Sequence, residues 1–154
     1  MKKQNLISIA FFSKIIILFC LPFLSCNFAS GSYPFAERFE INAPEISVIE
    51  AVNSFKKNNP IFIVPENYGF FDGKTKPNEH WFHLYFYNID KNEIYYCWTR
   101  PKTKKITTFA LISVKINDSK WLDINHDLSD DANKKIIDYF SKNILSKIKA
   151  YIKY

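Results

Sequence analysis

The side chains best suited to binding chemistry form a run in the middle of the chain. Trp81, His83, Tyr85 and Tyr87 alternate with other residues over positions 81–87. Because successive side chains of a β-strand point to opposite faces, this spacing predicts a row of rings on one face of a sheet. Such rings combine an apolar body with a polar rim, which suits stacking on sugars or contact with a protein. Tyr95 is predicted to extend the row from the next strand.

A structural role competes with this binding role. If the first predicted helix or the loop at residues 66–79 covers that face of the sheet, the rings belong to the hydrophobic core. The alternation itself is compatible with both readings.

Two histidines near this row invite a metal-binding interpretation that strand geometry disfavours. His80 and His83 lie three residues apart, so on a regular strand their side chains point to opposite faces. They cannot chelate one ion there. We expect no metal and no cofactor.

Asp123, Asn125 and Asp127 have the spacing that begins a calcium-binding loop. An EF-hand requires Gly at the sixth position and Glu at the twelfth, where this chain has Leu128 and Lys134. We therefore interpret the segment as a turn between a strand and a helix.

The sequence carries no local catalytic motif. We find no G-x-S-x-G, no H-E-x-x-H and no glycine-rich phosphate loop, and the chain has only three glycines. A protein without enzymatic activity is the leading expectation. An envelope hydrolase acting on glycan or peptide stays open as an alternative, because carboxylates distant in sequence can meet in space.

Positive charge is concentrated in one short segment. Arg100, Lys102, Lys104 and Lys105 lie within a predicted connection between two strands. This segment is either a solvated turn or a basic surface that meets anionic lipid or an acidic partner. The whole chain is formally +6, and about +3 without the three lysines among the first 25 residues, which is too mild to indicate nucleic acid as a partner.

The first 25 residues have the composition of a secretory signal. Lys2 and Lys3 open the chain, and residues 15–24 are apolar apart from Cys20 and Pro22. A charged start, a short apolar core and a small residue at the cleavage position are typical of a signal peptide. The apolar run is about half the roughly 20 residues that a membrane-spanning helix needs, which makes such a helix the less favoured alternative.

Residues 21–26, Leu-Pro-Phe-Leu-Ser-Cys, resemble the lipobox of bacterial lipoproteins. In that family a diacylglycerol is attached to the cysteine, and a peptidase then cuts in front of it. The resemblance implies a signal peptide at residues 1–25, a lipid anchor on Cys26 and a short tether over residues 26–38. Each buried methylene contributes about 0.8 kcal/mol, so two or three acyl chains suffice for stable attachment. Cleavage after Gly31 would instead release a secreted protein.

The cysteine count agrees with an anchor. Cys20 would leave with the signal and Cys26 would carry the lipid, so Cys97 remains alone in the folded part. No intramolecular disulfide is then available. We interpret Cys97 as a small hydrophobic residue of a buried strand.

The remaining residues, 39–154, predict a single domain. A first helix is expected over residues 47–58, where Ser47 and Glu50 have the spacing of a capping box. A short strand is expected at residues 61–64, and Phe70 and Phe71 are expected to attach the following loop. Four antiparallel strands follow, at residues 80–87, 93–99, 106–116 and 120–124. On the third of these, one aliphatic face is predicted to comprise Ile106, Ala110, Ile112, Val114 and Ile116.

The final helix has the strongest local signals. Ser129 is a candidate N-cap, and Asp130 and Asp131 suit the positive end of a helix dipole. An apolar stripe repeats at helical spacing and is expected to cover the aliphatic face of the sheet. Its members are Ile137, Phe140, Ile144, Ile148 and Tyr151. The pattern predicts an α+β fold with two layers: an N-terminal helix, an antiparallel meander and a C-terminal helix packed on the sheet.

The segments His80 to Tyr87 and Tyr96 to Pro101 resemble those of small lipoproteins of Bacteroidota such as flavobacteria. This resemblance implies an anchor in the bacterial cell envelope, in the outer membrane, with the domain outside the cytoplasm. It implies no activity. We expect a monomeric binding module that meets a protein or glycan partner at the membrane; an immunity-type lipoprotein that neutralises a toxin is the alternative within binding proteins.

Overall fold

The structure is a computed structural model that describes residues 32–117 and 119–153. The predicted signal peptide and Cys26 lie outside the described residues. From Phe35 onward the described residues belong to one compact unit. Among the residues that are described, no helix is both long enough and apolar enough to cross a membrane.

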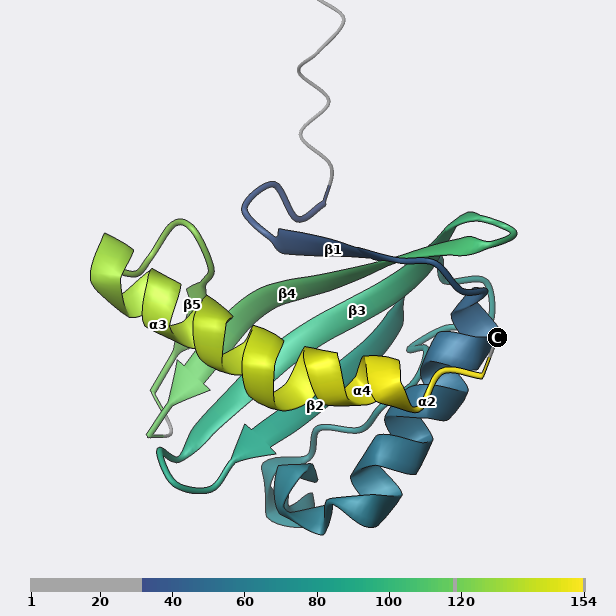
Figure 1. The fold of residues 1–154 in the computed structure, drawn as a ribbon. Coiled ribbons are helices and arrows are strands. Elements are labelled where there is room, and N and C mark those ends of the chain that lie inside the picture. Colours follow the sequence, from purple (N-terminus) through teal and green to yellow (C-terminus); the bar gives the residue numbers. More distant parts are fainter. Residues whose placement is uncertain (1–31, 118, 154) are drawn as a thin grey trace, which may run out of the picture. The chain divides into compact units, whose positions relative to one another are not determined.

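A five-stranded antiparallel sheet forms one layer of this unit (Figure 1). Along the sheet the order is β1-β4-β3-β2, and β5 pairs with the part of β4 that extends beyond β1. The predicted four-stranded meander is confirmed, and β1 is an addition that the sequence did not predict. The strands are β1 (Glu37–Ile41), β2 (Phe82–Asn88), β3 (Glu93–Thr103), β4 (Ile106–Ile116) and β5 (Trp121–Asp123).

Helices form the second layer, all on one face of the sheet. Helix α2 (Glu45–Asn58) precedes β2, and the chain ends in α3 (Asp130–Phe140), the π-helical turn η4 (Ser141–Leu145) and α4 (Ser146–Ala150), which run on as one rod (Figure 1). Between the layers, the ring of Phe86 lies 6.0–6.5 Å from those of Phe55, Phe109 and Phe140. The predicted two-layer α+β fold is confirmed. We call the helix-covered surface of the sheet its helix-side face and the opposite one its loop-side face.

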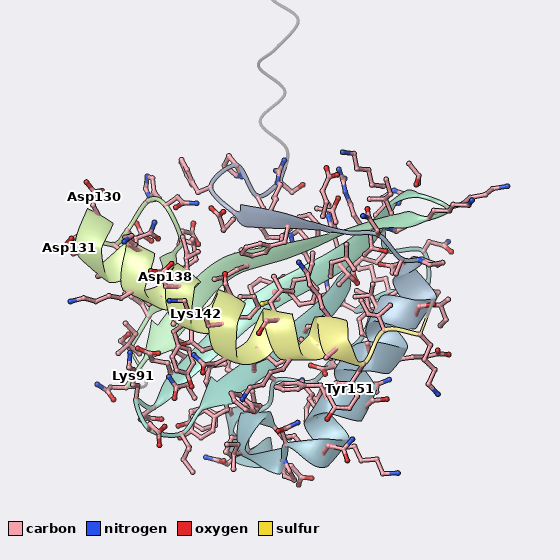
Figure 2. The ribbon with its side chains drawn as sticks, in the orientation of Figure 1. Lys91, Asp130, Asp131, Asp138, Lys142 and Tyr151 are labelled. Atoms are coloured by element: carbon pink, nitrogen blue, oxygen red, sulfur yellow. The ribbon has the colours of Figure 1, made fainter. Side chains whose placement is uncertain are left out.

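The final helix begins as predicted. The Ala132 amide donates to the Ser129 hydroxyl oxygen at 3.4 Å, and Asp130 and Asp131 lie in the first turn (Figure 2). The π-helical turn adds one residue to the helical repeat, so the buried stripe continues in phase along the rod. Ile136 is buried and Ile137 only half-buried, which shifts the predicted stripe by one residue at its start.

Two local predictions are wrong near the N-terminal helix. Helix α2 begins at Glu45 after Pro44, and the Val48 amide donates to the Pro44 carbonyl, so Ser47 lies inside the helix and caps nothing. The expected strand at residues 61–64 is absent. Pro60 instead starts the 3-10 helix η2 (Pro60–Phe62), because its fixed φ suits the first helical position. A second 3-10 turn, η3 (Glu66–Tyr68), follows.

A β-bulge in β4 reverses the predicted faces of half that strand. Tyr96 pairs with Ser113 but the next residue, Cys97, pairs with Leu111, so Ile112 has no partner across the ladder. Leu111 and Val114 therefore both pack in the core between the layers, together with Phe109. Ala110, predicted to lie under the final helix, is buried opposite Trp98 on the loop-side face instead. Ile112, the bulged residue, is buried outside the core cluster between the layers.

Candidate functional site

A cluster of four rings occupies the centre of the loop-side face. Tyr85 on β2 lies opposite Tyr96 on β3, and their rings stack at 5.1 Å with an angle of 15°. The ring of Trp121 on β5 makes T-shaped contacts with those of Tyr96, at 5.9 Å, and Phe70, at 5.3 Å. All four side chains are half-buried. The cluster joins three strands to the loop before β2.

The segment at residues 69–80, which we call the face loop, covers part of this cluster. Phe70 stacks on Tyr85 at 5.1 Å and an angle of 19°. The competing structural role is therefore realised in part, since Tyr85 serves as a floor for the loop. Phe71 was also expected to attach the loop to the domain, but 70% of its surface is exposed. It stands at the outer side of the loop as an accessible aromatic ring.

The predicted row of rings lies on the loop-side face, with one exception. Trp81 is half-buried 6.5 Å from the Trp98 ring, and Tyr87 donates to Asn92 Oδ1 at 2.9 Å. His83 is 6% exposed. Tyr95 lies on the helix-side face and is fully buried, so its predicted place in the row is wrong.

The error at Tyr95 comes from hairpin length. The strand-to-strand turn has four residues, 89–92, because Asn88 pairs with Glu93 and still belongs to β2. This register places Tyr96 opposite Tyr85, whereas a five-residue turn would have placed Tyr95 there. The Tyr95 hydroxyl instead donates to the buried Glu93 carboxylate at 2.5 Å, on the core side.

A chain of hydrogen bonds holds His83 between the loop and β3. Its Nε2 lies 2.8 Å from Glu79 Oε1, and its Nδ1 lies 2.8 Å from the Tyr96 hydroxyl. The other carboxylate oxygen of Glu79 accepts from the amide and the hydroxyl of Thr75. The bond from the Thr75 hydroxyl, then that from His83 and then that from the Thr75 amide lower the pKa of Glu79 to about 2. An ionised carboxylate only accepts, so Nε2 of His83 donates the hydrogen bond to Glu79.

Both nitrogens of His83 are thus occupied within the protein. A metal ion would have to displace one of these bonds. Among the described residues, no three His, Cys, Asp or Glu side chains lie close enough together to hold a metal ion. Glu79 is ionised at physiological pH and so cannot act as a general acid. The arrangement fixes the face loop to the sheet.

The face loop also closes the outer edge of β2. Gly73 exchanges two backbone hydrogen bonds with His83, of 2.8 and 2.9 Å. Next along the edge, the Tyr85 amide donates to Asp72 Oδ1 at 2.9 Å, and the Lys56 ammonium donates to the Tyr85 carbonyl at 2.6 Å. Unpaired edge groups are a template for strand addition. Here they are satisfied at two successive outward-facing positions, 83 and 85.

Lys56 is an ammonium group held largely away from water. Its nitrogen lies 2.5 Å from Asp72 Oδ2 and 4.6 Å from the centre of the Phe86 ring. Burial lowers the pKa of Lys56, and this effect outweighs the opposite pull of Asp72. Asp72, the Tyr85 carbonyl and the Phe86 ring therefore orient the ammonium group. The sequence did not predict that Lys56 contacts the sheet edge.

Three hollows lie around the face loop. The first, of about 250 Å³, is lined by Glu45, Lys74, Glu79, His80, Arg100 and Pro101. The second, of about 300 Å³, includes Lys74, Thr75, His83 and Tyr85 in its lining. The third, of about 250 Å³, is lined by Lys56, Ile63, Val64 and Glu66. The second and third share four lining residues, which are Phe70, Phe71, Asp72 and Tyr85.

The other candidate residues have structural surroundings. The Asp123 amide donates to Asp127 Oδ2, and the Asn125 amide donates to Asn133, which agrees with a turn rather than a calcium loop. Cys97 is fully buried, and burial raises the pKa of its thiol, so no reactive thiolate forms.

The basic segment is part of the sheet rather than a separate connection. Strand β3 continues through Thr103, and Lys104 and Lys105 alone make the turn to β4. Lys102 pairs with Glu40 on β1, while Arg100 lies 5.8 Å from the Trp98 ring centre and lines the first hollow. The predicted basic surface is thus divided between the hairpin tip and the loop-side face.

Comparisons of the chain with protein-family models, with curated proteins and with solved structures give no match.

Proposed function

We propose that this protein is a bacterial envelope lipoprotein, anchored through Cys26, whose domain binds a partner through its loop-side face. The proposal combines the lipobox-like segment at residues 21–26 with the chemistry of that face. Two or three acyl chains would hold the domain at the outer membrane, outside the cytoplasm. The binding role requires no catalytic step.

One observation carries the binding role: accessible aromatic rings gather on the face that no helix covers. Phe71 is 70% exposed and lines the same hollows as Phe70 and Tyr85, which are half-buried, as are Tyr96 and Trp121 in the cluster of four rings. Half-exposed aromatic rings fixed by their neighbours are typical of binding hot spots, because little conformational entropy remains to be lost. The ring contacts of 5.1–5.9 Å provide that rigidity here.

The hydrogen-bonded group of Glu79, His83 and Tyr96 supports binding rather than catalysis. Each member uses its polar atoms on the next, and Glu79 is ionised with a pKa of about 2. A general acid or base instead needs a pKa near the working pH. The group is suited to holding the face loop rigid.

Site-specific photocrosslinking tests the binding face. A benzoylphenylalanine at position 71 replaces one exposed aromatic ring by another and leaves the core untouched. We expect a discrete crosslinked species in intact cells. The same group at Ile46, which is 62% exposed on α2, is the matched control and should give no such species. Equal crosslinking at both positions, or none at 71, contradicts the proposal.

Mass spectrometry of the N-terminal peptide tests the anchor separately. The expected peptide begins at Cys26 and carries acyl chains. A peptide that begins at Met1 or Ser32 contradicts the anchor and leaves the binding face to be judged by crosslinking.

A further inference from the structure

Strand β1 forms the border of the sheet on the side away from β2. Among the described strands, none pairs with its outer side, and β5 lies beyond its end along β4. Figure 1 shows β1 along the upper border of the sheet. The opposite border, the edge of β2, is closed by the face loop and Lys56. A further strand can therefore join this sheet at β1.

One row of paired residues across the sheet shows which residues of β1 direct their backbone groups outward. His83 directs its groups to the outer edge of β2, so Trp98, which lies opposite it, bonds to Ala110 on β4. Arg38 lies opposite Ala110 on the other side, and its backbone groups therefore point away from the sheet. Alternation gives Glu40 the same orientation.

The side chains at these two positions complement those of a second copy of β1. Arg38 and Glu40 are exposed on the loop-side face, the face of Ala110. When two copies of β1 pair antiparallel about Phe39, each Arg38 lies opposite Glu40 of the other copy. Pairs of opposite charge across two strands stabilise a sheet. Glu40 also pairs with Lys102 of its own chain, and an ionised carboxylate has acceptor sites for both cations.

The charges select one register. Sliding one copy by two residues is the smallest step that keeps outward backbone groups opposite each other. It places either Arg38 opposite Arg38 or Glu40 opposite Glu40, and like charges directly opposite destabilise a sheet. Charged side chains on an edge strand usually discourage pairing. On β1 they discourage the shifted registers and favour the one centred on Phe39.

Phe39 adds an apolar contact at the centre of this register. Its ring is half-buried at the margin of the core, 6.2 Å from that of Phe140. The backbone of Phe39 bonds to Phe109 on β4, so the two copies of Phe39 form a non-hydrogen-bonded pair. Side chains lie closest in pairs of this kind. Each ring would therefore cover the exposed part of the other.

We infer that two copies of this chain associate through β1, antiparallel about Phe39, and form one continuous sheet. The two-fold axis passes through the sheet, so both loop-side faces lie on the same side of the dimer. Two aromatic clusters are then presented together, and a partner with repeated features gains avidity from binding both. A dimer departs from the monomer expected from the sequence. The inference concerns a different surface from the proposed binding face and does not depend on it.

Sedimentation equilibrium of the full-length chain in detergent measures this association. We expect a monomer–dimer equilibrium with a Kd of about 1–100 μM, because a pair of five-residue strands is a small interface. Arg38→Glu or Glu40→Arg alone should weaken the dimer by about tenfold or more, since two attractive pairs become repulsive.

A charge exchange provides the decisive variant. Arg38→Glu combined with Glu40→Arg restores opposite charges at both positions and should return the Kd to within about threefold of the wild type. Lys105→Glu reverses a charge at the hairpin tip and is the matched control, which should associate as the wild type does. All three positions are exposed, so the variants should fold alike.

Disulfide crosslinking tests the register. Phe39→Cys places two thiols at a non-hydrogen-bonded pair, where Cα atoms lie about 4.5 Å apart, within the reach of a disulfide. Glu37→Cys is the control, because position 37 lies opposite position 41 and its two copies are about 13 Å apart. Oxidation should give a covalent dimer for Phe39→Cys, and for Glu37→Cys no more than for the wild type.

Several results would overturn the inference. They are a monomer over the whole concentration range, a dimer that the single charge reversals leave unchanged, or a double variant as weak as the single ones. Equal crosslinking of Phe39→Cys and Glu37→Cys would contradict the register and the inference with it. A monomer that still gives the specific crosslink from position 71 would exclude the dimer and leave the proposed binding face standing.

Discussion

Replacing Lys56 with methionine tests how the outer edge of β2 is closed. Methionine keeps the unbranched apolar stem and removes the ammonium group. The variant therefore loses the 2.5 Å contact with Asp72, the 2.6 Å hydrogen bond to the Tyr85 carbonyl and the position over the Phe86 ring. Lys57, the next residue of α2, is exposed and provides a matched control.

The expected loss follows from these contacts and from burial. A hydrogen bond to a charged group contributes about 1.5–3 kcal/mol, and a cation over a ring about 0.5–2 kcal/mol. Desolvation opposes both, as the lowered pKa of Lys56 indicates. Asp72 keeps 23% of its side chain exposed, so water replaces part of the lost pairing. We expect Lys56→Met to lower the free energy of unfolding by about 2 kcal/mol, less than for a fully buried pair.

Urea denaturation followed by tryptophan fluorescence measures this loss. Lys57→Met should stay within about 0.5 kcal/mol of the wild type. In a double-mutant cycle, Lys56→Met and Asp72→Asn should couple by about 1 kcal/mol or more. Either single variant already removes the ion pair between the two side chains, so the second substitution has less left to remove. Equal stability of Lys56→Met and Lys57→Met, or additive effects in the cycle, would refute the proposed closure of the edge.

Two further predictions concern the face loop. Because the pKa of Glu79 is lowered from 4.5 to about 2, chiefly by Thr75 and then by His83, its ionised form stabilises the fold above pH 4.5 and this contribution is lost as pH falls towards 2. Urea midpoints of the wild type and Glu79→Gln should therefore differ above pH 4.5 and converge at about 2; a constant difference contradicts this. Phe70→Ala should lower the free energy of unfolding by about 1–3 kcal/mol, because the variant loses two ring contacts. Phe71→Ala should lower it by less than about 0.5 kcal/mol, because the Phe71 ring is exposed. Equal losses in thermal or urea unfolding would show that the two rings are wrongly placed.

Sequence patterns predicted correctly those helices and strands whose ends are determined by residues close to them in the chain. The final helix could be predicted because Ser129 caps it, Asp130 and Asp131 lie in its first turn and most of its predicted apolar stripe is buried. The bounds of β4, Ile106–Ile116, also match the prediction, since the segment is rich in Ile, Thr, Val and Phe and is followed by the turn residues Asn117-Asp118-Ser119. These signals lie within a few residues of the structure that they determine.

The faces of the strands could not be predicted in full, because they depend on pairing between strands. The bulge at Ile112 exists only relative to β3, and it reverses which residues of β4 meet the helices. Likewise, one residue in the length of the turn before Glu93 decides whether Tyr95 or Tyr96 joins the row of rings. Alternation gives the period of a strand but not its phase.

The sequence predicted only part of the candidate site. Trp81, His83 and Tyr85 were predicted on the correct face because they alternate along β2 and the residue directly before it. Phe71 and Trp121 come from a loop and a distant short strand, and only tertiary contacts bring them to the same surface. The predicted covering of that face is partial, because Phe70 packs inward and Phe71 does not.

Hydroxyl-radical footprinting of the wild-type protein in intact cells tests most directly whether the loop-side face is occupied. The comparison is with the purified chain in detergent, and the readout is oxidation of individual aromatic side chains. The account predicts that Phe71 and Trp121 are oxidised less in cells, while Tyr151 on the opposite, helical side is oxidised equally in both samples. Equal oxidation of Phe71 and Trp121 in both samples would contradict a binding role for this face.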